Sequence, residues 1–298
     1  MKNGVKHALP TEVQQLMERY TVELKEIFLD EKIVGVYIYG SIALGAFYKE
    51  TSDVDFVTVI NDSVNEAEKQ QLVELHKKLS DNTLGKRMNG MYIPLADLGK
   101  YNDEMNEYVY CADGKANVGH WDINAVTWWT LKNQGITVTG KEAEDLPLQI
   151  QWNDVVNTMK YNVEQYWSEK AKKPYLFFIE EWVESAVVTM GRILYTLNHK
   201  TIVSKDRGLQ YLSERSAEEW EPLLKEVARI RHNPKEKRIF SRWRRADMTK
   251  RYLLHLIETC REKWWGRKWT IQWGVLSFFM LNLVYNGLKS LIMLEGIG

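Results

Sequence analysis

The sequence predicts an α+β protein in which a mixed α/β domain is followed by an all-helical domain. Strand-like runs rich in β-branched residues lie before Gly140, whereas long helical patterns dominate after it. The halves also differ in charge: residues 1–150 hold 15 Lys and Arg against 23 Asp and Glu, and the rest hold 25 against 17, which gives −8 and +8. We expect domains at 1–145 and 146–268 and an apolar tail at 269–298.

The expected elements follow from periodicity and turn signals. Thr11–Gln14 has a capping-box pattern and opens a helix that ends near Phe28. Strands are predicted at Lys32–Tyr39, Asp53–Ile60 and Met88–Leu95, and helices of the first domain at Val64–Leu79 and Asp122–Asn133. Helices of the second domain are predicted at Gln151–Lys170, Tyr175–Leu197, Lys205–Leu212, Ala217–Arg231 and Asp247–Trp265.

Composition excludes several classes of protein. With 45% hydrophobic and 27% charged residues, the chain is not of the disordered or collagen type. Its net charge of zero gives no overall attraction to nucleic acid, so we expect no nucleic-acid partner. Two cysteines cannot form a disulfide framework or a structural zinc site. No secretory signal is apparent, and we expect a cytoplasmic monomer or weak dimer.

The apolar tail is ambiguous. Val275–Leu294 contains 14 apolar residues among 20, and basic residues precede it, as they do for a membrane span. Polar residues within this stretch, among them Asn282 and Lys289, oppose that interpretation because lipid penalises them. We therefore favour a buried or partner-seeking helix over a membrane span.

One segment carries the chemistry. Gly40 and Ser41 follow a predicted strand, and Asp53 and Asp55 lie on the next one. Carboxylates at i and i+2 of a strand share a face, where they repel each other unless a divalent cation lies between them. Oxygen ligands of this kind suit Mg²⁺, and a glycine bend lets the backbone approach phosphate closely. The combination predicts a site for a metal and a nucleotide.

This segment resembles the G-S…D-x-D signature of the nucleotidyltransferase superfamily that includes DNA polymerase β. The remainder, over residues 15–260, resembles the streptomycin/spectinomycin adenylyltransferases, with a second anchor at 187–206. That family has a nucleotidyltransferase domain with a mixed sheet, followed by a helical domain. The resemblance implies that Gly40, Ser41, Ser204 and Lys205 bind ATP, as does Arg192 unless it forms a structural ion pair. It also implies that Asp53 and Asp55 bind Mg²⁺ and act in catalysis.

The resemblance fails at one catalytic position. The family has a glutamate on its third strand, as general base or as a further metal ligand, where this chain has Asn89. A neutral amide cannot accept a proton. Asp97 is one candidate replacement. The alternatives are therefore an adenylyltransferase with another base, a slow enzyme, or a nucleotide-binding relative without efficient catalysis.

The acceptor is expected to be a small cationic molecule resembling an aminoglycoside. The acidic first domain suits such a molecule, and so do Glu181, Trp182 and Glu184 on one helix, which combine negative charge with an aromatic ring. A solvated helix face would look similar. Residues 229–251 contain ten Lys and Arg, which could contact nucleic-acid phosphates or form a solvated surface beside the nucleotide. The first alternative would indicate a transferase that modifies nucleic acid.

Overall fold

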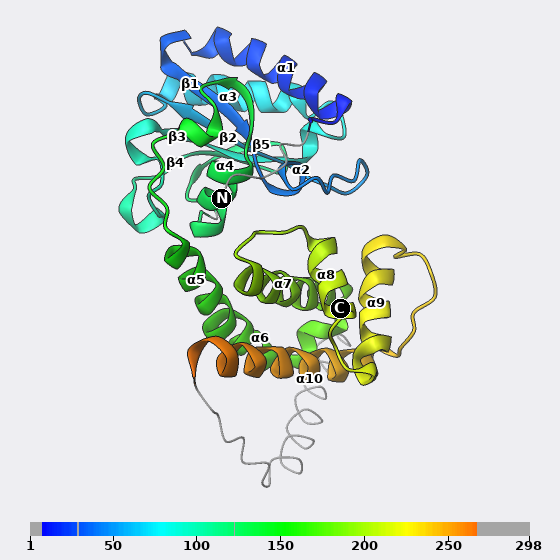
Figure 1. The fold of residues 1–298 in the computed structure, drawn as a ribbon. Coiled ribbons are helices and arrows are strands. Elements are labelled where there is room, and N and C mark those ends of the chain that lie inside the picture. The colour runs from blue at the N-terminus through cyan, green and yellow to red at the C-terminus, as the bar shows by residue number, and fades with distance from the viewer. Residues whose placement is uncertain (1–7, 29, 122, 267–298) are drawn as a thin grey trace, which may run out of the picture. The chain divides into compact units, whose positions relative to one another are not determined.

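The computed structural model describes residues 8–28, 30–121 and 123–266 (Figure 1). Within these ranges, the residues up to Ile257 belong to one compact unit, and those from Glu258 to Gly266 belong to a second. The first part of the chain contains α1 (Thr11–Ile27), β1 (Ile33–Ile38), α2 (Gly40–Ala43), β2 (Val54–Ile60), α3 (Glu66–Leu79), β3 (Met88–Pro94), β4 (Tyr108–Ala112), β5 (Lys115–Gly119), α4 (Ala125–Gln134) and β6 (Ile136–Gly140). The second contains α5 (Trp152–Tyr161), α6 (Ser168–Ala171), α7 (Glu180–His199), α8 (Lys205–Ser213), α9 (Glu221–His232) and α10 (Arg242–Cys260).

The strands form one mixed sheet in the order β5-β4-β3-β2-β1-β6. β2 and β3 run parallel, with Asp55 opposite Asn89, and the other neighbouring strands of the described sheet are antiparallel. Because β2 and β3 are adjacent and parallel, their first residues lie side by side at one end of the sheet. The acid pair and the position that lacks a carboxylate are therefore neighbours.

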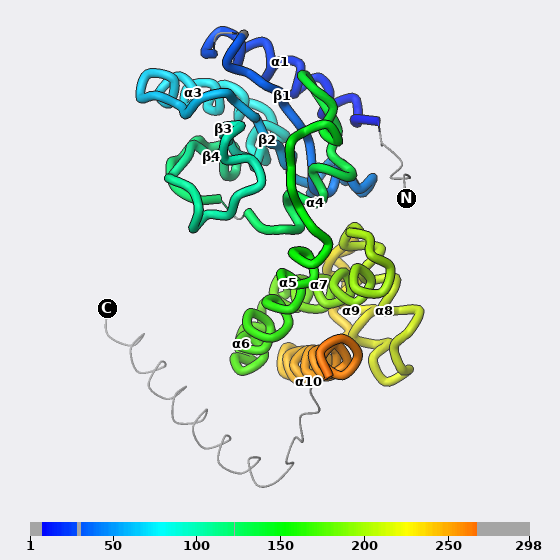
Figure 2. Tube along the Cα trace, turned by 60° about the vertical axis from the view of Figure 1, so that its left-hand side comes forward, coloured from blue at the N-terminus to red at the C-terminus, as the bar shows by residue number. Residues whose placement is uncertain are grey.

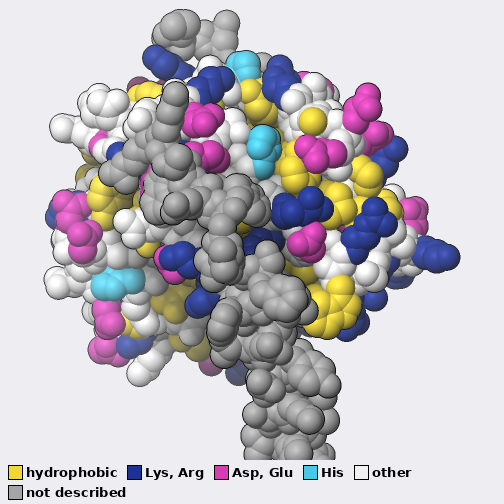
Figure 3. All heavy atoms as spheres, turned by 90° about the horizontal axis from the view of Figure 1, so that it is seen from below, with side chains coloured by type: hydrophobic (Ala, Val, Ile, Leu, Met, Phe, Trp, Pro, Cys, Tyr) yellow, Lys and Arg dark blue, Asp and Glu magenta, His cyan; other side chains and the backbone are white. Residues whose placement is uncertain are grey.

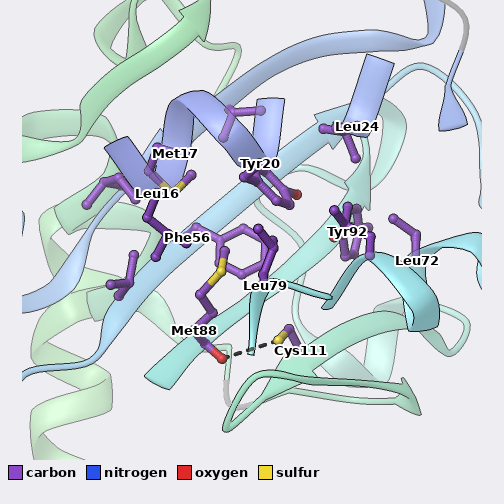
Figure 4. Close-up of a cluster of buried hydrophobic side chains, with 14 of the residues drawn as sticks. Leu16, Met17, Tyr20, Leu24, Phe56, Leu72, Leu79, Met88, Tyr92 and Cys111 are labelled. Atoms are coloured by element: carbon purple, nitrogen blue, oxygen red, sulfur yellow. Dashed lines mark hydrogen bonds between the residues drawn. The ribbon is translucent and has the colours of Figure 1, made fainter. Parts of the chain in front are cut away.

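Helices α1 and α3 cover one face of the sheet (Figure 1). Tyr20 and Leu24 of α1 pack there with Phe56 of β2 and Tyr92 of β3 (Figure 4). Alternate residues of a strand point to opposite faces, so the neighbours of Phe56 in β2 point away from this core. Asp55 is one of them. The hydrophobic packing of β2 thus fixes which way the carboxylate points.

In the helical part, α7 lies beside both α8 and α9 (Figure 2). Gly191 of α7 and Gly208 of α8 make this contact possible: a Cβ on Gly191 would overlap the carbonyl oxygen of Gly208. Close packing therefore sets the start of α8, where Lys205 lies, next to the middle of α7, where Arg192 lies.

The predicted fold class is confirmed, and so are three strands, at β1, β2 and β3. Strands β4, β5 and β6 were not expected. Pro174–Phe178 forms a 3-10 turn where the sequence indicated the start of the helix that becomes α7, and α10 begins at Arg242, before the predicted Asp247. The limits at 145/146 and 268/269 stay predictions, and the tail 269–298 lies outside the described residues. None of the described helices combines the length and apolarity needed to cross a bilayer.

Candidate active site at the start of β2

The acid pair lies where β2 begins. Asp53 precedes the strand and Asp55 is its second residue. Burial raises the pKa of Asp55 to about 7, and the negative charge of Asp53 adds to the rise. The backbone N–H of Ser41 donates to the Asp55 carboxylate and partly offsets it. Burial also raises the pKa of Asp53. Two carboxylates that resist ionisation side by side are suited to a divalent cation.

The glycine bend contacts Asp55 directly. Gly40 has φ +67°, in the left-handed region, and a Cβ there would overlap the carboxylate of Asp55. The Tyr39 N–H donates to the Asp55 carbonyl oxygen at 3.0 Å, which joins the end of β1 to β2. The structure therefore brings together the Gly-Ser bend and the acid pair. No residue other than glycine fits at position 40 without displacing Asp55.

Two cationic side chains of the helical part act on the acid pair through their charge. The positive charges of Lys205 and Arg192 both lower the pKa of Asp55. Arg192 is half-buried, and its Nε donates to the Val203 carbonyl oxygen at 2.8 Å. Lys205 is the exposed first residue of α8, which Ser204 caps by accepting the N–H of Arg207 at 3.3 Å. The site thus combines two carboxylates and two cationic side chains from distant parts of the chain.

A cavity of about 340 Å³ adjoins the acid pair. Gly40, Asp55 and Arg192 line it, together with five threonines and two asparagines: Thr127, Thr130, Thr158, Thr189, Thr196, Asn124 and Asn162. Of the described residues around it, Asp55 and Arg192 alone carry a charge. Its walls can donate and accept hydrogen bonds but hold little net charge, which suits a neutral polar group such as a nucleoside.

Asn89 occupies the position of the missing carboxylate. It lies opposite Asp55 in the parallel ladder, and its Oδ1 accepts the backbone N–H of Asp113 at 2.8 Å. Its amide group donates to the carboxylate of Asp53 and so lowers the pKa of that acid. The suggested replacement Asp97 is wrong: it follows the far end of β3, about 20 Å along the strand, and it pairs with Lys100 at 2.6 Å.

Two residues near the acid pair were missed by the sequence reasoning. Arg87 lies just before β3, lowers the pKa of Asp53 and donates to the Ser52 carbonyl oxygen at 2.7 Å. Asp113, in the turn between β4 and β5, raises the pKa of Asp53. The sequence did hold a signal for this turn: the Asp113-Gly114 dipeptide is a strong indicator of a two-residue hairpin turn.

The expected acceptor residues on α7 are not at this site. Glu184 pairs with Arg231 at 2.9 Å, Trp182 packs edge-on against Trp167, and Glu181 is exposed. Of the three, none lines the cavity beside Asp55. The interpretation of this helix face as an acceptor site is therefore not supported by the geometry. Glu184 is a structural partner for an arginine.

Much of the basic segment 229–251 is used within the fold. Arg229, Arg231, Arg238 and Arg245 all pair with acidic residues of the helical part. In the view from below, basic side chains are interspersed with acidic and hydrophobic ones (Figure 3). These guanidinium groups are therefore committed to intramolecular ion pairs.

The donor set at β2 fits a divalent metal ion. Asp55 on a rigid strand and Asp53 just before it offer carboxylate oxygens, and their mutual repulsion gives a cation a direct electrostatic role. Over the described ranges, no group of three His, Cys, Asp or Glu side chains could hold a metal ion. A cation here would complete its shell with water or phosphate oxygens, as Mg²⁺ commonly does.

Comparisons with known proteins agree with this architecture. Residues 22–95 match the family described as nucleotidyltransferase domain, and residues 148–256 match the family described as aminoglycoside adenylyltransferase, C-terminal domain. No curated protein matches the chain.

The chain also resembles solved structures. The spectinomycin adenyltransferase AAD(9) from Enterococcus faecialis, whose crystal structure contains ATP and spectinomycin, has a TM-score of 0.59 at 15% identity, over 82% of this chain and 98% of that chain. At this identity the likeness shows the fold alone. A toxin-antitoxin with AMP-PNP is 14% identical over 50% of this chain and 92% of that chain, and its TM-score of 0.27 carries no argument.

The two family matches lie on the two parts that the fold distinguishes, and the similar structure covers both. The resemblance inferred from the sequence is confirmed: the chain combines a nucleotidyltransferase domain with an aminoglycoside adenylyltransferase C-terminal domain.

Proposed function

We propose that the protein is a Mg²⁺-dependent adenylyltransferase that transfers AMP from ATP to a hydroxyl group of a small, cationic, aminoglycoside-like molecule and releases pyrophosphate. One observation carries this proposal: Asp55 lies against the Gly40 bend and beside Asp53, and the charges of Lys205 and Arg192 act on this pair. Anionic and cationic groups on one site match the needs of a metal and a triphosphate together.

The described residues divide the tasks of ATP binding. Lys205 and Arg192 would neutralise phosphate oxygens, and the open backbone at Gly40 would admit a phosphate beside the acids. Ser41 uses its N–H on Asp55, so its hydroxyl is the group left for the nucleotide. The threonine- and asparagine-lined cavity would take the nucleoside, since its walls offer hydrogen bonds without net charge.

Asp53 and Asp55 would hold Mg²⁺ through their carboxylate oxygens. Bound there, the ion would polarise the α-phosphate and offset the charge that develops during transfer. The protein contributes position and electrostatics: Asn89 donates to Asp53 and Ser41 donates to Asp55, so both carboxylates are held in place. The acceptor hydroxyl forms a bond to the α-phosphorus, and the bond to pyrophosphate breaks.

The acceptor class follows from charge and from the C-terminal domain. The first half of the chain carries −8, which favours approach of a polycation. Residues 148–256 match the family described as aminoglycoside adenylyltransferase, C-terminal domain, and the similar enzyme AAD(9) was crystallised with ATP and spectinomycin. Spectinomycin and streptomycin are therefore the first acceptors to test.

The test is pyrophosphate release from ATP and Mg²⁺ with spectinomycin, streptomycin and a wider aminoglycoside panel. We expect turnover that requires an acceptor and is lost in Asp53→Asn. Glu181→Gln is the matched control, because Glu181 is an exposed acid away from the cavity. Absence of acceptor-dependent release across the panel would contradict the acceptor class, and full activity of Asp53→Asn would contradict the mechanism.

A second candidate function is nucleotide binding without efficient catalysis. Asn89 favours it, because an amide stands beside the acid pair where the family has a general base. Calorimetry distinguishes the two functions. Tight binding of ATP with Mg²⁺, without turnover in the native chain or in Asn89→Glu, would support the binding module.

A further inference from the structure

We propose that Asp113 supplies the carboxylate that position 89 lacks, and that this carboxylate takes the proton of the acceptor hydroxyl. The inference rests on the proposed function. It assigns the general-base role to a hairpin turn between β4 and β5 rather than to strand β3.

The turn that carries Asp113 is built tightly onto β3. Asp113 and Gly114 are the two loop residues between paired Ala112 and Lys115, with φ of 49° and 69°. Such a turn twists in the same sense as its strands. Gly114 donates its N–H to the Met88 carbonyl oxygen at 3.0 Å, and Ser80 donates to the Gly114 carbonyl oxygen at 2.8 Å. The backbone of the turn is therefore fixed beside the first residues of β3.

A further contact secures the end of β4. The Cys111 thiol donates to the carbonyl oxygen of Met88 at 3.2 Å (Figure 4). Met88 is the residue opposite Val54 in the β2–β3 ladder, and Val54 separates the two acids of the site. The same residue thus anchors the Asp113 turn and the strand next to the acid pair, so the turn holds a set position relative to Asp53.

Asn89 links the two carboxylates. Its Oδ1 accepts the Asp113 N–H at 2.8 Å, while its amide group donates to Asp53. A carboxylate could accept the first bond but could not donate the second. A carboxylate at position 89 would also add a third negative charge directly against Asp53 and Asp55. With Asn89 in place, the third negative charge is that of Asp113, which is joined to Asn89 by a hydrogen bond and lies further from Asp55.

The environment of Asp113 suits a base on the acceptor side of the site. Asp113 is exposed, and among the described residues it has no ion-pair partner. Its charge still raises the pKa of Asp53, so it lies within electrostatic reach of the acid pair. It does not join Asp53 and Asp55 in a three-carboxylate group able to hold a metal, as far as the described residues go. In this proposal Asp113 therefore serves the incoming hydroxyl, while Asp53 and Asp55 hold the ion.

The proposed transfer moves one proton to Asp113 and exchanges one bond at the α-phosphorus. The acceptor O–H proton moves to the Asp113 carboxylate as the acceptor oxygen bonds to the α-phosphorus of ATP. The α-phosphorus to oxygen bond breaks at the same time, and pyrophosphate leaves with that electron pair. The proton then passes from Asp113 to solvent, which the exposed position of the side chain allows.

The experiment compares Asp113→Asn with the native chain in pyrophosphate release with ATP, Mg²⁺ and spectinomycin. Asparagine tolerates the left-handed conformation and keeps the backbone N–H to Asn89, so the variant removes only the charge. We expect kcat to fall by ~10²–10⁴-fold, with Kd for ATP and Mg²⁺ by calorimetry within about twofold of the native value. Asp103→Asn, an exposed acid in the segment before β4, is the matched control and should keep the native kcat.

Two further variants separate a base from a structural residue. Asp113→Gly also fits the left-handed backbone, and added formate should restore part of its rate. Adding Asn89→Glu to Asp113→Asn should recover at least about tenfold of the lost kcat, since it returns a carboxylate to the site. A structural role would give neither rescue.

Three results would overturn the inference. An Asp113→Asn variant within about threefold of the native kcat would leave no base role to assign. A loss of affinity for ATP and Mg²⁺ like that of Asp53→Asn would place Asp113 on the metal side. A native chain that binds ATP and Mg²⁺ yet adenylylates no acceptor would overturn the proposed function and this inference together.

Discussion

Two clusters of charged side chains differ in how their charges are compensated. At the start of β2, Asp53 and Asp55 repel each other, and the pKa of Asp55 rises to about 7. In the helical part, Glu226 lies fully buried with Arg229 at 3.0 Å and Arg245 at 3.5 Å. Both carboxylates of this cluster, Glu226 and Glu180, have arginine partners, and a third arginine, Arg238, pairs with Glu180 at 2.5 Å.

The contrast shows most clearly in the pKa values of Glu180 and Asp55. Burial alone would raise the pKa of Glu180, but hydrogen bonds from Arg238 and Arg229 overcome it and lower the pKa to about 2. Burial of Asp55 is opposed only by Ser41 and by the more distant charges of Lys205 and Arg192. A cluster that is neutralised by its own chain is suited to holding the fold. One left uncompensated is suited to binding something from outside.

The largest expected effect concerns what the uncompensated pair binds. Asp55→Asn removes a carboxylate next to the Gly40 bend and should lower acceptor-dependent pyrophosphate release by at least about 10³-fold, or roughly 4 kcal/mol. Steady-state kinetics measures this loss. An Asp55→Asn variant with native turnover would show that the acid pair has no part in catalysis, like the arginine cluster.

The next effect tests the compensated cluster. Glu226→Gln leaves Arg245 and Arg229 buried without their full anionic partner, so we expect the free energy of unfolding to fall by about 3 kcal/mol. Urea unfolding at neutral pH provides the measurement. Glu181→Gln, on an exposed acid of α7, should change it by less than about 0.5 kcal/mol. If Glu226→Gln and Glu181→Gln lowered the free energy of unfolding equally, the arginine cluster would have no special role in holding the fold.

A smaller effect has the opposite sign. Because the pKa of Asp55 is raised, the folded chain holds this proton more tightly than the unfolded chain, and stability is lost as pH rises from about 4 to about 7. Without metal, Asp55→Asn should therefore stabilise the fold at pH 8, by on the order of 2 kcal/mol, and should match the native chain near pH 4. Urea titrations at both pH values test this. A variant less stable at pH 8 would show that Asp55 is already compensated.

The smallest effect concerns the partly exposed side of the arginine cluster. Arg238→Met should cost less than about 1 kcal/mol at pH 7, because solvent screens this pair. The lowered pKa of Glu180 makes its contribution present above about pH 4.5 and lost as pH falls toward 2. Acid unfolding of Arg238→Met should therefore begin at a higher pH than that of the native chain, as circular dichroism would show. An unchanged acid transition would exclude Arg238 from the stabilisation of Glu180.

Much of the fold was predictable because its signals are local. The β-branched runs of β1, β2 and β3 alternate over consecutive residues, and the helices repeat their apolar residues every three or four positions. Strands β4, β5 and β6 are five residues each, too short for their residue pattern to distinguish them from loops. Their pairing depends on strands placed by distant parts of the chain, which periodicity cannot show.

The sequence by itself determined the acid pair and the glycine bend, because strand alternation and the spacing of Gly40 and Asp55 are local properties. Only the tertiary structure decided which charged residues face the site. Glu184 and Asp113 look alike in sequence as acids near aromatic residues, yet one is held by Arg231 and the other lies next to Asn89. That difference depends on contacts between residues more than twenty positions apart, which are set by packing of helices and strands and not by neighbouring residues in the chain.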